Sequence, residues 1–162
     1  MTVDPRQLVQ DLARRGDTLA TAESLTGGRL AALLTSVPGA SACFLGGVVA
    51  YATPVKTSLL DVPGSIIDEH GVVSAECAAA MASGARALLG STFALATTGV
   101  AGPDQQEGRP VGHVWVAGAG PRGVETRLLS LDGDRAAIQD GSCRGALSVL
   151  VAMLRQEDSG LG

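Results

Sequence analysis

Aromatic residues are almost absent from this chain of 162 residues, since one Trp, one Tyr and two Phe make up 2% of it. Hydrophobic residues nevertheless make up 46%, so the core must consist mainly of Ala, Val and Leu. That apolar content is too high for a disordered chain, and we attribute the 22 glycines to tight turns and close backbone approaches. The length predicts a single domain over residues 1–162.

Long apolar runs, metal-binding patterns and clustered positive charge are also missing. Gly or polar residues interrupt every apolar run well before ~18 residues, so we expect no membrane segment and no signal peptide. Cys43, Cys77 and Cys143 lack metal-ligand spacing, so we expect no metal and no cofactor, and buried reduced thiols indicate the cytoplasm. A net charge of −4 without a basic run argues against binding to nucleic acid.

Lysine occurs once, because Lys56 is the only lysine among 12 basic residues. Arg cannot give up its proton in a protein, whereas a partly buried Lys can. Lys56 falls in the first turn of a helix predicted to begin at Pro54, where the positive helix end lowers the pKa of an amine. Tyr51, the only tyrosine, ends the preceding strand. The simpler alternative is a surface lysine and a tyrosine that packs its ring.

Helical and strand patterns alternate along the chain. Spacing of apolar residues predicts helices over residues 5–15, 26–35, 54–60, 75–89 and 134–156, and strands over 18–22, 44–52, 93–97, 113–119 and 124–131. The last two strands form a hairpin, Pro63-Gly64 forms a turn, and the tail over 157–162 should fray. The pattern predicts an α/β fold, a three-layer α/β/α sandwich with a mixed, mostly parallel sheet.

A serine ends the first predicted strand and precedes a glycine pair. Ser24 is followed by Leu25-Thr26-Gly27-Gly28, and free N–H groups at such a turn can hold a phosphate or an oxyanion. Taken alone, the motif is more typical of an ordinary helix cap. Together with the single Lys and the single Tyr, it suggests a Ser/Lys nucleophilic enzyme.

The carboxyl ends of three strands should form one crevice. Parallel strands bring Ser24, Tyr51 and Thr98 to the same edge of the sheet, with Lys56 within hydrogen-bond reach of Ser24. Thr98 opens a long glycine-containing loop that runs to Pro110, and its length without structure of its own indicates function. Arg135 at the last helix start either holds a phosphate or simply begins the helix.

Either of the two histidines, His70 or His113, could instead serve Ser24 as its base. His70 precedes Gly71 in a predicted turn, and His113 begins a predicted strand. The sequence leaves open which group is the base.

Six motifs in this order resemble the CinA C-terminal domain family, whose free-standing form is the nicotinamide-mononucleotide amidohydrolase (PncC). They are TAESLTGG at 21–28, GGVVAY at 46–51 followed by Lys56, HGVVS at 70–74, TGVAGPD at 98–104, PVGHVWVA at 110–117 and GDR at 133–135. The resemblance runs from about residue 5 to 155. It implies an α/β/α fold for nearly the whole chain.

The resemblance also implies an activity, which is hydrolysis of the carboxamide of nicotinamide mononucleotide to the acid plus ammonia in pyridine-nucleotide salvage. Ser24 would be the nucleophile, assisted by Lys56 and Tyr51, with either of the two as general base. The expected substrate contacts are Thr26, Gly27, Gly28, Thr98, Gly99, Gly102 and Arg135. The competing hypothesis is a non-catalytic nucleotide-binding module of the competence/damage-inducible type.

Two segments depart from the family pattern. Family members usually carry a further Arg four residues after the GDR arginine, where this chain has Gln139. The glycine loop usually continues with more glycines and a Lys, where this chain has Gln-Gln-Glu-Gly-Arg over 105–109. Both changes touch expected phosphate contacts, so they affect either the affinity for the substrate or the choice of substrate, and Gln139 should make the phosphate site weaker. We expect a small-molecule nucleotide as partner, and a homo-oligomer in which the Ala-rich helix over 75–88 packs against another copy.

Overall fold

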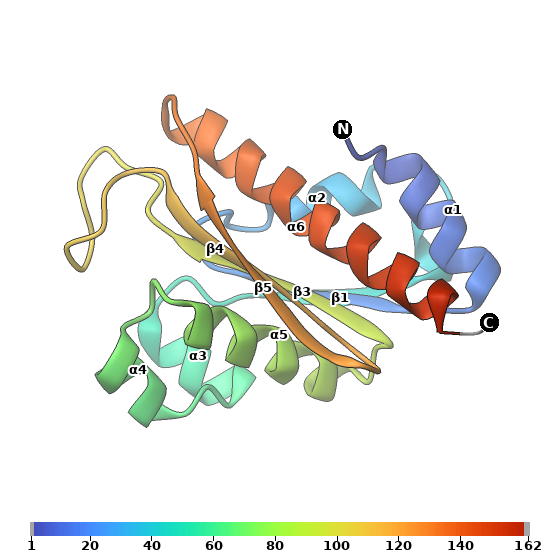
Figure 1. The fold of residues 1–162 in the computed structure, drawn as a ribbon, viewed down its shortest axis with the longest axis horizontal. Coiled ribbons are helices and arrows are strands. Elements are labelled where there is room, and N and C mark those ends of the chain that lie inside the picture. Colours follow the sequence, from blue (N-terminus) through green and yellow to red (C-terminus); the bar gives the residue numbers. More distant parts are fainter. Residues whose placement is uncertain (1, 161–162) are drawn as a thin grey trace.

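The computed structural model describes residues 2–160 and contains one five-stranded sheet with the strand order β2-β1-β3-β4-β5 (Figure 1). The strands are β1 (Leu19–Glu23), β2 (Phe44–Val49), β3 (Phe93–Gly99), β4 (His113–Gly120) and β5 (Gly123–Ser130). β1 runs parallel to β2 and β3, whereas β4 is antiparallel to β3 and β5, so four strands share one direction. The predicted mixed, mostly parallel sheet is confirmed.

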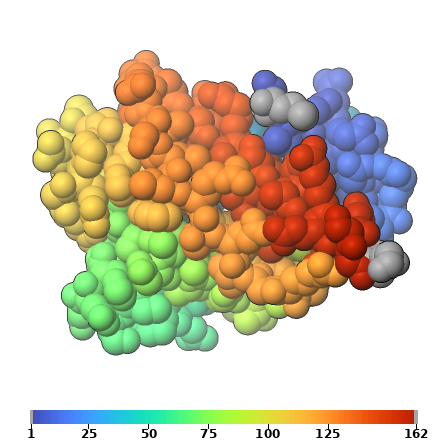
Figure 2. Space-filling view, in the orientation of Figure 1, coloured from blue at the N-terminus to red at the C-terminus, as the bar shows by residue number. Residues whose placement is uncertain are grey.

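Helices cover both faces of the sheet, which confirms the predicted three layers (Figure 1). One layer holds α1 (Pro5–Arg15), α2 (Arg29–Thr35) and α6 (Arg135–Ser159), and the other holds α3 (Thr53–Leu60), α4 (Gly64–His70) and α5 (Ala75–Leu89). A short 3-10 turn, η1 (Ala40–Ala42), precedes β2. Figure 2 shows α1, in blue, beside the end of α6, in red.

Local capping explains why several helices begin and end where predicted. The side chain of Asp4 accepts a hydrogen bond from the Arg6 amide and begins α1, and Gly16 ends it at φ 72°. Ser74 caps α5 by accepting from the Cys77 amide, and Gly90 ends that helix. Since each cap satisfies an amide that the helix leaves unpaired, these boundaries follow from the local sequence.

The two faces of the sheet are packed with different side chains. The face under α1, α2 and α6 buries large residues such as Leu30, Leu147 and Leu150. The face under α3, α4 and α5 buries mainly alanines from the sheet and from α5, among them Ala20, Ala22, Ala78, Ala82, Ala94 and Ala96. Small side chains let α5 lie close to the sheet, and the expected Ala, Val and Leu core is confirmed.

Three predicted boundaries near the N-terminal half are wrong. α2 begins at Arg29 and not at Thr26, because Gly27 and Gly28 take positive φ angles of 57° and 102° that a helix cannot contain. β2 ends at Val49, before the predicted end. The segment after Pro63 continues as α4, where only a turn was predicted.

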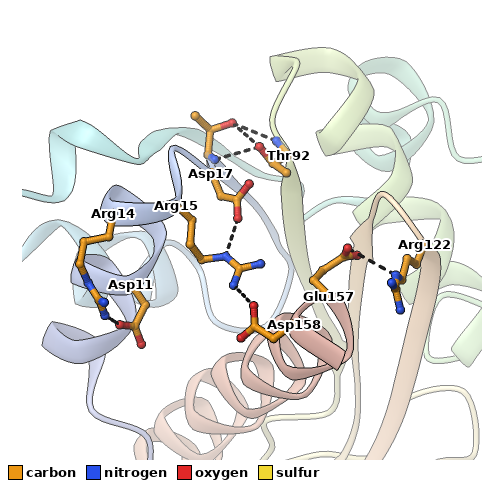
Figure 3. A network of polar contacts seen from close by, with 9 residues as sticks. Asp11, Arg14, Arg15, Asp17, Thr92, Arg122, Glu157 and Asp158 are labelled. Atoms are coloured by element: carbon orange, nitrogen blue, oxygen red, sulfur yellow. Dashed lines mark hydrogen bonds and ion pairs between the residues drawn. The ribbon is translucent and has the colours of Figure 1, made fainter. Parts of the chain in front are cut away.

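The C-terminal tail is more ordered than predicted. α6 continues to Ser159, because Asp158 forms an ion pair with Arg15 of α1 and Glu157 lies 3.4 Å from Arg122 in the β4–β5 turn (Figure 3). These partners are distant in the sequence, so the tail composition alone does not reveal them. The predicted fraying of residues 161–162 lies outside the described residues.

Candidate active site

Strand ends and loops from five parts of the chain surround one cavity of about 350 Å³ at an edge of the sheet. Its lining includes Ser24, Leu25, Tyr51, Lys56, Val72, Val73, Thr98, Gly99, Gly102 and Arg135. The structure therefore brings together seven of the ten site residues proposed from the sequence. A larger groove of about 730 Å³ lies between α1 and α6, and neither Ser24 nor Lys56 lines it.

Ser24 and Lys56 are hydrogen-bonded in the floor of this cavity. Lys56 is 1% exposed, and its Nζ lies 3.0 Å from Ser24 Oγ. Nζ also lies 2.8 Å from the Ala50 carbonyl oxygen and 3.4 Å from that of Tyr51. These three partners are all uncharged oxygens, so no carboxylate within hydrogen-bond distance compensates a positive charge on Lys56.

Burial changes the proton affinity of this amine. Desolvation lowers the pKa of Lys56 below its ordinary value of 10.5, and the charges of Cys77 and Glu107 partly oppose that shift. Two carbonyls suit the two N–H groups of a neutral amine, which leaves the lone pair for the Ser24 hydroxyl. In that state, the amine can accept the proton of Ser24.

The strands hold these two residues through main-chain bonds. The Ser24 amide donates to the Thr97 carbonyl at 3.0 Å, and the Ala50 amide donates to the Glu23 carbonyl at 2.8 Å. Both bonds continue the sheet one residue beyond the ends of β1 and β2. Pro54 lies in the first turn of α3, and Lys56 follows it within that turn. The serine and the lysine therefore sit on rigid elements.

A buried carboxylate lies next to the serine. Glu23 is 1% exposed, and it accepts hydrogen bonds from the Thr26 hydroxyl at 2.6 Å, the Leu30 amide at 2.7 Å and the Ala31 amide at 3.1 Å. Thr26 also bonds Thr97 Oγ1 at 2.8 Å. Glu23 thus accepts the hydrogen bonds of amides at the start of α2, where the sequence suggested that a phosphate or an oxyanion would bind. Sequence reasoning missed this role.

Thr26, Gly27 and Gly28 lie outside the cavity lining. Thr26 is buried, and the two glycines form the turn that leads from Ser24 into α2. The backbone amides of Leu25 and Thr26 donate to no acceptor within residues 2–160. This turn therefore presents Ser24 and carries two free N–H groups beside it.

Tyr51 and Arg135 meet at the mouth of the cavity. Tyr51 is 58% exposed, and its hydroxyl accepts a hydrogen bond from Arg135 Nη2 at 2.9 Å. Arg135 Nη1 donates to the Gly102 carbonyl at 2.5 Å. The tyrosine hydroxyl is thus bonded to Arg135, and only its main-chain carbonyl contacts Lys56.

The glycine loop after β3 forms another wall. Gly99 lies so close to β4 that a Cβ atom there would approach the His113 carbonyl oxygen to 2.7 Å, which explains the need for glycine. The Thr98 hydroxyl donates to the Val72 carbonyl at 2.7 Å. Gln139, at the position where an Arg was expected, donates to the Leu25 carbonyl at 2.9 Å and braces the serine turn.

The alternative bases lie elsewhere. His70 is the last residue of α4, and its ring nitrogens lie 3.8 Å from the carboxylates of Glu69 and Glu76. It does not line the cavity. His113 lies in β4, and burial, followed by the charge of Arg109, lowers its pKa. The structure therefore brings neither histidine to Ser24.

The described part of the chain was also compared with the requirements of a metal site and of a membrane-spanning helix. Within residues 2–160, no group of three or more His, Cys, Asp or Glu side chains is arranged to hold a metal ion. Over the same residues, no helix combines the length and the apolar character needed to span a bilayer. Cys43, Cys77 and Cys143 are free and buried, as the sequence predicted.

Comparison with known proteins gives a consistent result. The sequence model of the CinA C-terminal domain matches residues 4–154. A CinA-like protein of Frankia casuarinae is 52% identical over 143 residues, which are 88% of this chain and 33% of that protein. A putative competence-damage inducible protein of Desulforamulus reducens is 47% identical over 86% of this chain and 34% of its own length. The chain thus spans about a third of the length of these relatives.

Solved structures show the same fold. A competence-damaged protein (CinA) superfamily protein of Escherichia coli has a TM-score of 0.89 and 31% identity, with 92% of this chain and 87% of that chain covered. A competence/damage inducible protein of Agrobacterium tumefaciens has a TM-score of 0.88 and 35% identity, with 91% and 92% covered. Motif order, sheet topology and these matches agree that the chain belongs to the CinA C-terminal domain family.

Proposed function

We propose that this chain is an amidohydrolase that converts nicotinamide mononucleotide to nicotinic acid mononucleotide and ammonia. The observation that carries the proposal is the buried Lys56 amine, which lies 3.0 Å from Ser24 Oγ while main-chain carbonyls occupy its other donor positions. A structural lysine would be better stabilised by a carboxylate. An amine with a lowered pKa beside a hydroxyl suits activation of a nucleophile.

The chemistry proceeds through an acyl-enzyme. Ser24 Oγ attacks the carboxamide carbon while Lys56 Nζ takes the hydroxyl proton, and a tetrahedral oxyanion forms. The oxyanion then re-forms the carbonyl group: Lys56 returns the proton to the leaving nitrogen, the C–N bond breaks, ammonia departs and the Ser24 ester remains. Water attacks the Ser24 ester with Lys56 again as base, and the acid product leaves while the serine regains its proton.

A backbone amide next to the serine supplies the oxyanion site in this mechanism. We assign this role to the free N–H group of Leu25, which follows the nucleophile directly and lines the cavity. Gly27 and Gly28 then support the reaction by shaping the turn, and the Thr26 side chain does so through Glu23. Of the two bases that the sequence left open, we assign the role to Lys56, because the Tyr51 hydroxyl is bonded to Arg135.

The phosphate of the nucleotide belongs near Arg135 in this proposal. Arg135 lies in the cavity lining, and its guanidinium brings a positive charge and N–H donors that suit a phosphate. The start of α2 is a poorer choice, since Glu23 already accepts from its amides. Thr98, Gly99 and Gly102 would then line the space between phosphate and carboxamide.

The test is ammonia release from nicotinamide mononucleotide by the wild-type protein, with Ser24→Ala as the control. We expect turnover in the wild type and its loss in the variant, whereas equal rates in both proteins would overturn the role of Ser24. Nicotinamide riboside should bind at least about tenfold more weakly than the mononucleotide if a phosphate site exists. A protein that binds the nucleotide without releasing ammonia would instead be the non-catalytic module.

Location and assembly complete the proposal. We propose that the protein works in the cytoplasm, since its three thiols are free and buried. We also retain a homo-oligomer as a hypothesis, because Leu59 and Leu88 are 50% and 52% exposed on the α3 and α5 surface. Sedimentation at micromolar concentration tests the assembly, and a monomer would contradict it.

A further inference from the structure

The loop between β3 and β4 has a tight, exposed tip. The Gln106 amide lies 3.3 Å from the Arg109 carbonyl, and the reverse bond is 2.8 Å, so Glu107 and Gly108 form a two-residue turn. Glu107 has a φ of 51°, which is unfavourable for a residue other than glycine. A residue in this conformation needs support from its surroundings. In Figure 2, the loop, in yellow, lies against the green surface of the helices that follow β2.

The support comes from the Glu107 carboxylate. Oε1 accepts the Val72 amide at 3.1 Å and Oε2 accepts the Val73 amide at 3.1 Å. Gly71 makes room for the carboxylate, because a Cβ atom there would lie 2.4 Å from Glu107 Oε2. The two amides lie just before Ser74, the cap of α5, where a negative charge is favoured.

This contact joins two walls of the cavity. Val72 and Val73 line it from one side, and residues 102–106 of the loop line it from another. Among residues 103–110, Glu107 is the one whose side chain hydrogen-bonds another segment of the described chain. At the base of the loop, Arg135 holds the Gly102 carbonyl. The wall formed by the loop therefore depends on one carboxylate at its tip.

We propose that Glu107 is a positioning residue that fastens the 103–110 loop to the Val72–Val73 amides and so completes the nucleotide site. The proposal deepens the amidohydrolase function and rests on it for its kinetic consequences. If the loop is released, only a fraction of the molecules have the cavity in the form that binds the nucleotide. The apparent affinity for the nucleotide then falls in proportion to that fraction. The loss should therefore appear mainly in KM.

The charge of Glu107 gives a second, independent signature. Glu107 is the carboxylate whose charge acts on Lys56. Cys77 of α5 also lies near it, but burial raises the pKa of that thiol to about 11, so the thiol is neutral at neutral pH. Tyr51, Asp104 and Arg135 share the cavity with Lys56. The negative charge of Glu107 opposes the lowering of the Lys56 pKa by burial. Removing that charge should move the acid limb of kcat/KM to lower pH, which a purely structural role would not do.

Three variants separate the contact from the charge. Glu107→Gln keeps the shape but replaces one acceptor oxygen by an NH₂ group that faces an amide, and it removes the charge. Glu107→Asp keeps the charge and shortens the side chain by one methylene, so it cannot reach both amides. Asp68→Asn is the matched control, because it removes one exposed carboxylate from α4. Far-UV circular dichroism and thermal melting verify that each variant folds.

Hydrogen exchange tests the contact of Glu107 with the Val72 and Val73 amides without reference to any activity. In Glu107→Gln and Glu107→Asp, we expect the Val72 and Val73 amides to exchange at least about tenfold faster than in wild type, and unchanged rates in Asp68→Asn. Unchanged exchange in the two Glu107 variants would overturn the proposal. This measurement does not depend on ammonia release. It therefore tests the Glu107 contact separately from the proposed amidohydrolase function.

Kinetics with nicotinamide mononucleotide then test the consequence for the site. We expect KM to rise about tenfold in both Glu107 variants, with kcat within about threefold of wild type. The acid limb should move to lower pH in Glu107→Gln and stay in place in Glu107→Asp. Wild-type KM and an unmoved acid limb in Glu107→Gln would show that Glu107 has no part in positioning.

Discussion

Glu23 and Lys56 are equally buried, each 1% exposed, and they lie on opposite faces of the same sheet edge. The Glu23 carboxylate is surrounded by three donors from the start of α2 and the turn before it. The Lys56 amine meets a hydroxyl and two carbonyls, and burial lowers its pKa. The same degree of burial therefore accompanies two different chemical situations.

The partners account for the difference. A carboxylate that accepts several N–H and O–H bonds fixes the chain around it. An amine that meets only uncharged oxygens gains little from being charged, so it readily exists as a base. We infer that Glu23 stabilises the turn after Ser24, whereas Lys56 is the base of the proposed reaction. Neighbouring buried charges can thus be sorted into structural and reactive groups by what surrounds them.

Of the variants considered, Lys56→Arg should have the largest effect on ammonia release. Arginine keeps the positive charge but cannot accept a proton at neutral pH, so kcat for ammonia release should fall by about 10³-fold or more. Nucleotide binding should persist, since the phosphate is assigned to Arg135. Activity near the wild-type value would show that Lys56 is merely an electrostatic group and would remove the distinction from Glu23.

Glu23→Ala should act on stability first. It leaves the Thr26 hydroxyl and the Leu30 and Ala31 amides without their acceptor, so the free energy of unfolding should fall by about 3 kcal/mol. Urea denaturation measures the change. Glu23→Gln, which keeps one acceptor oxygen, should cost less. A protein of unchanged stability would contradict the structural role of Glu23.

The pH dependence sharpens the comparison further. Activity requires neutral Lys56, so kcat/KM should rise with pH and level off below pH 10.5, the ordinary value of the lysine pKa. The folded-state pKa is the lower one, so between it and pH 10.5 the unfolded chain binds more protons, and stability due to Lys56 rises with pH. Lys56→Met should lack this rise. An activity limb centred at or above pH 10.5 would contradict the lowered pKa.

Tyr51→Phe should have the smallest effect. The hydroxyl is exposed and bonds only Arg135 among the described residues, so kcat and KM should each change by about threefold at most. Steady-state kinetics beside Lys56→Arg provide the measurement. A loss as large as that of Lys56→Arg would put Tyr51 in the path of the proton.

The sequence revealed those parts of the site that depend on strand ends. Ser24 and Lys56 could be predicted to meet, because parallel strands deliver their carboxyl ends to one edge and a single lysine follows one of them. The role of Glu23 could not, since its amide partners lie seven and eight residues onward, beyond a glycine turn whose path the sequence does not specify. The contact of Glu107 with Val72 spans 35 residues and was equally invisible.

In the fold, too, features that depend on nearby residues could be predicted, whereas features that depend on distant residues could not. The starts of α1 and α5 agree with the expected ranges, because the caps Asp4 and Ser74 lie only two or three residues from the amides that they bind. The order of the C-terminal turn of α6 depends on Arg15 and Arg122, which only the folded chain brings near. α4 was missed because Pro63-Gly64 is more typical of a turn than of a helix start.

The main-chain partners of Lys56 have a consequence for inhibition and resistance. Ala50 and Tyr51 hold the amine through their carbonyl oxygens, which every amino acid possesses. A point mutation at either position leaves those oxygens in the main chain, so it cannot detach the lysine by removing a side-chain partner. If the proposed reaction is correct, a compound that acylates Ser24 should meet few escape mutations, since changes at Ser24 or Lys56 themselves would abolish the reaction as well.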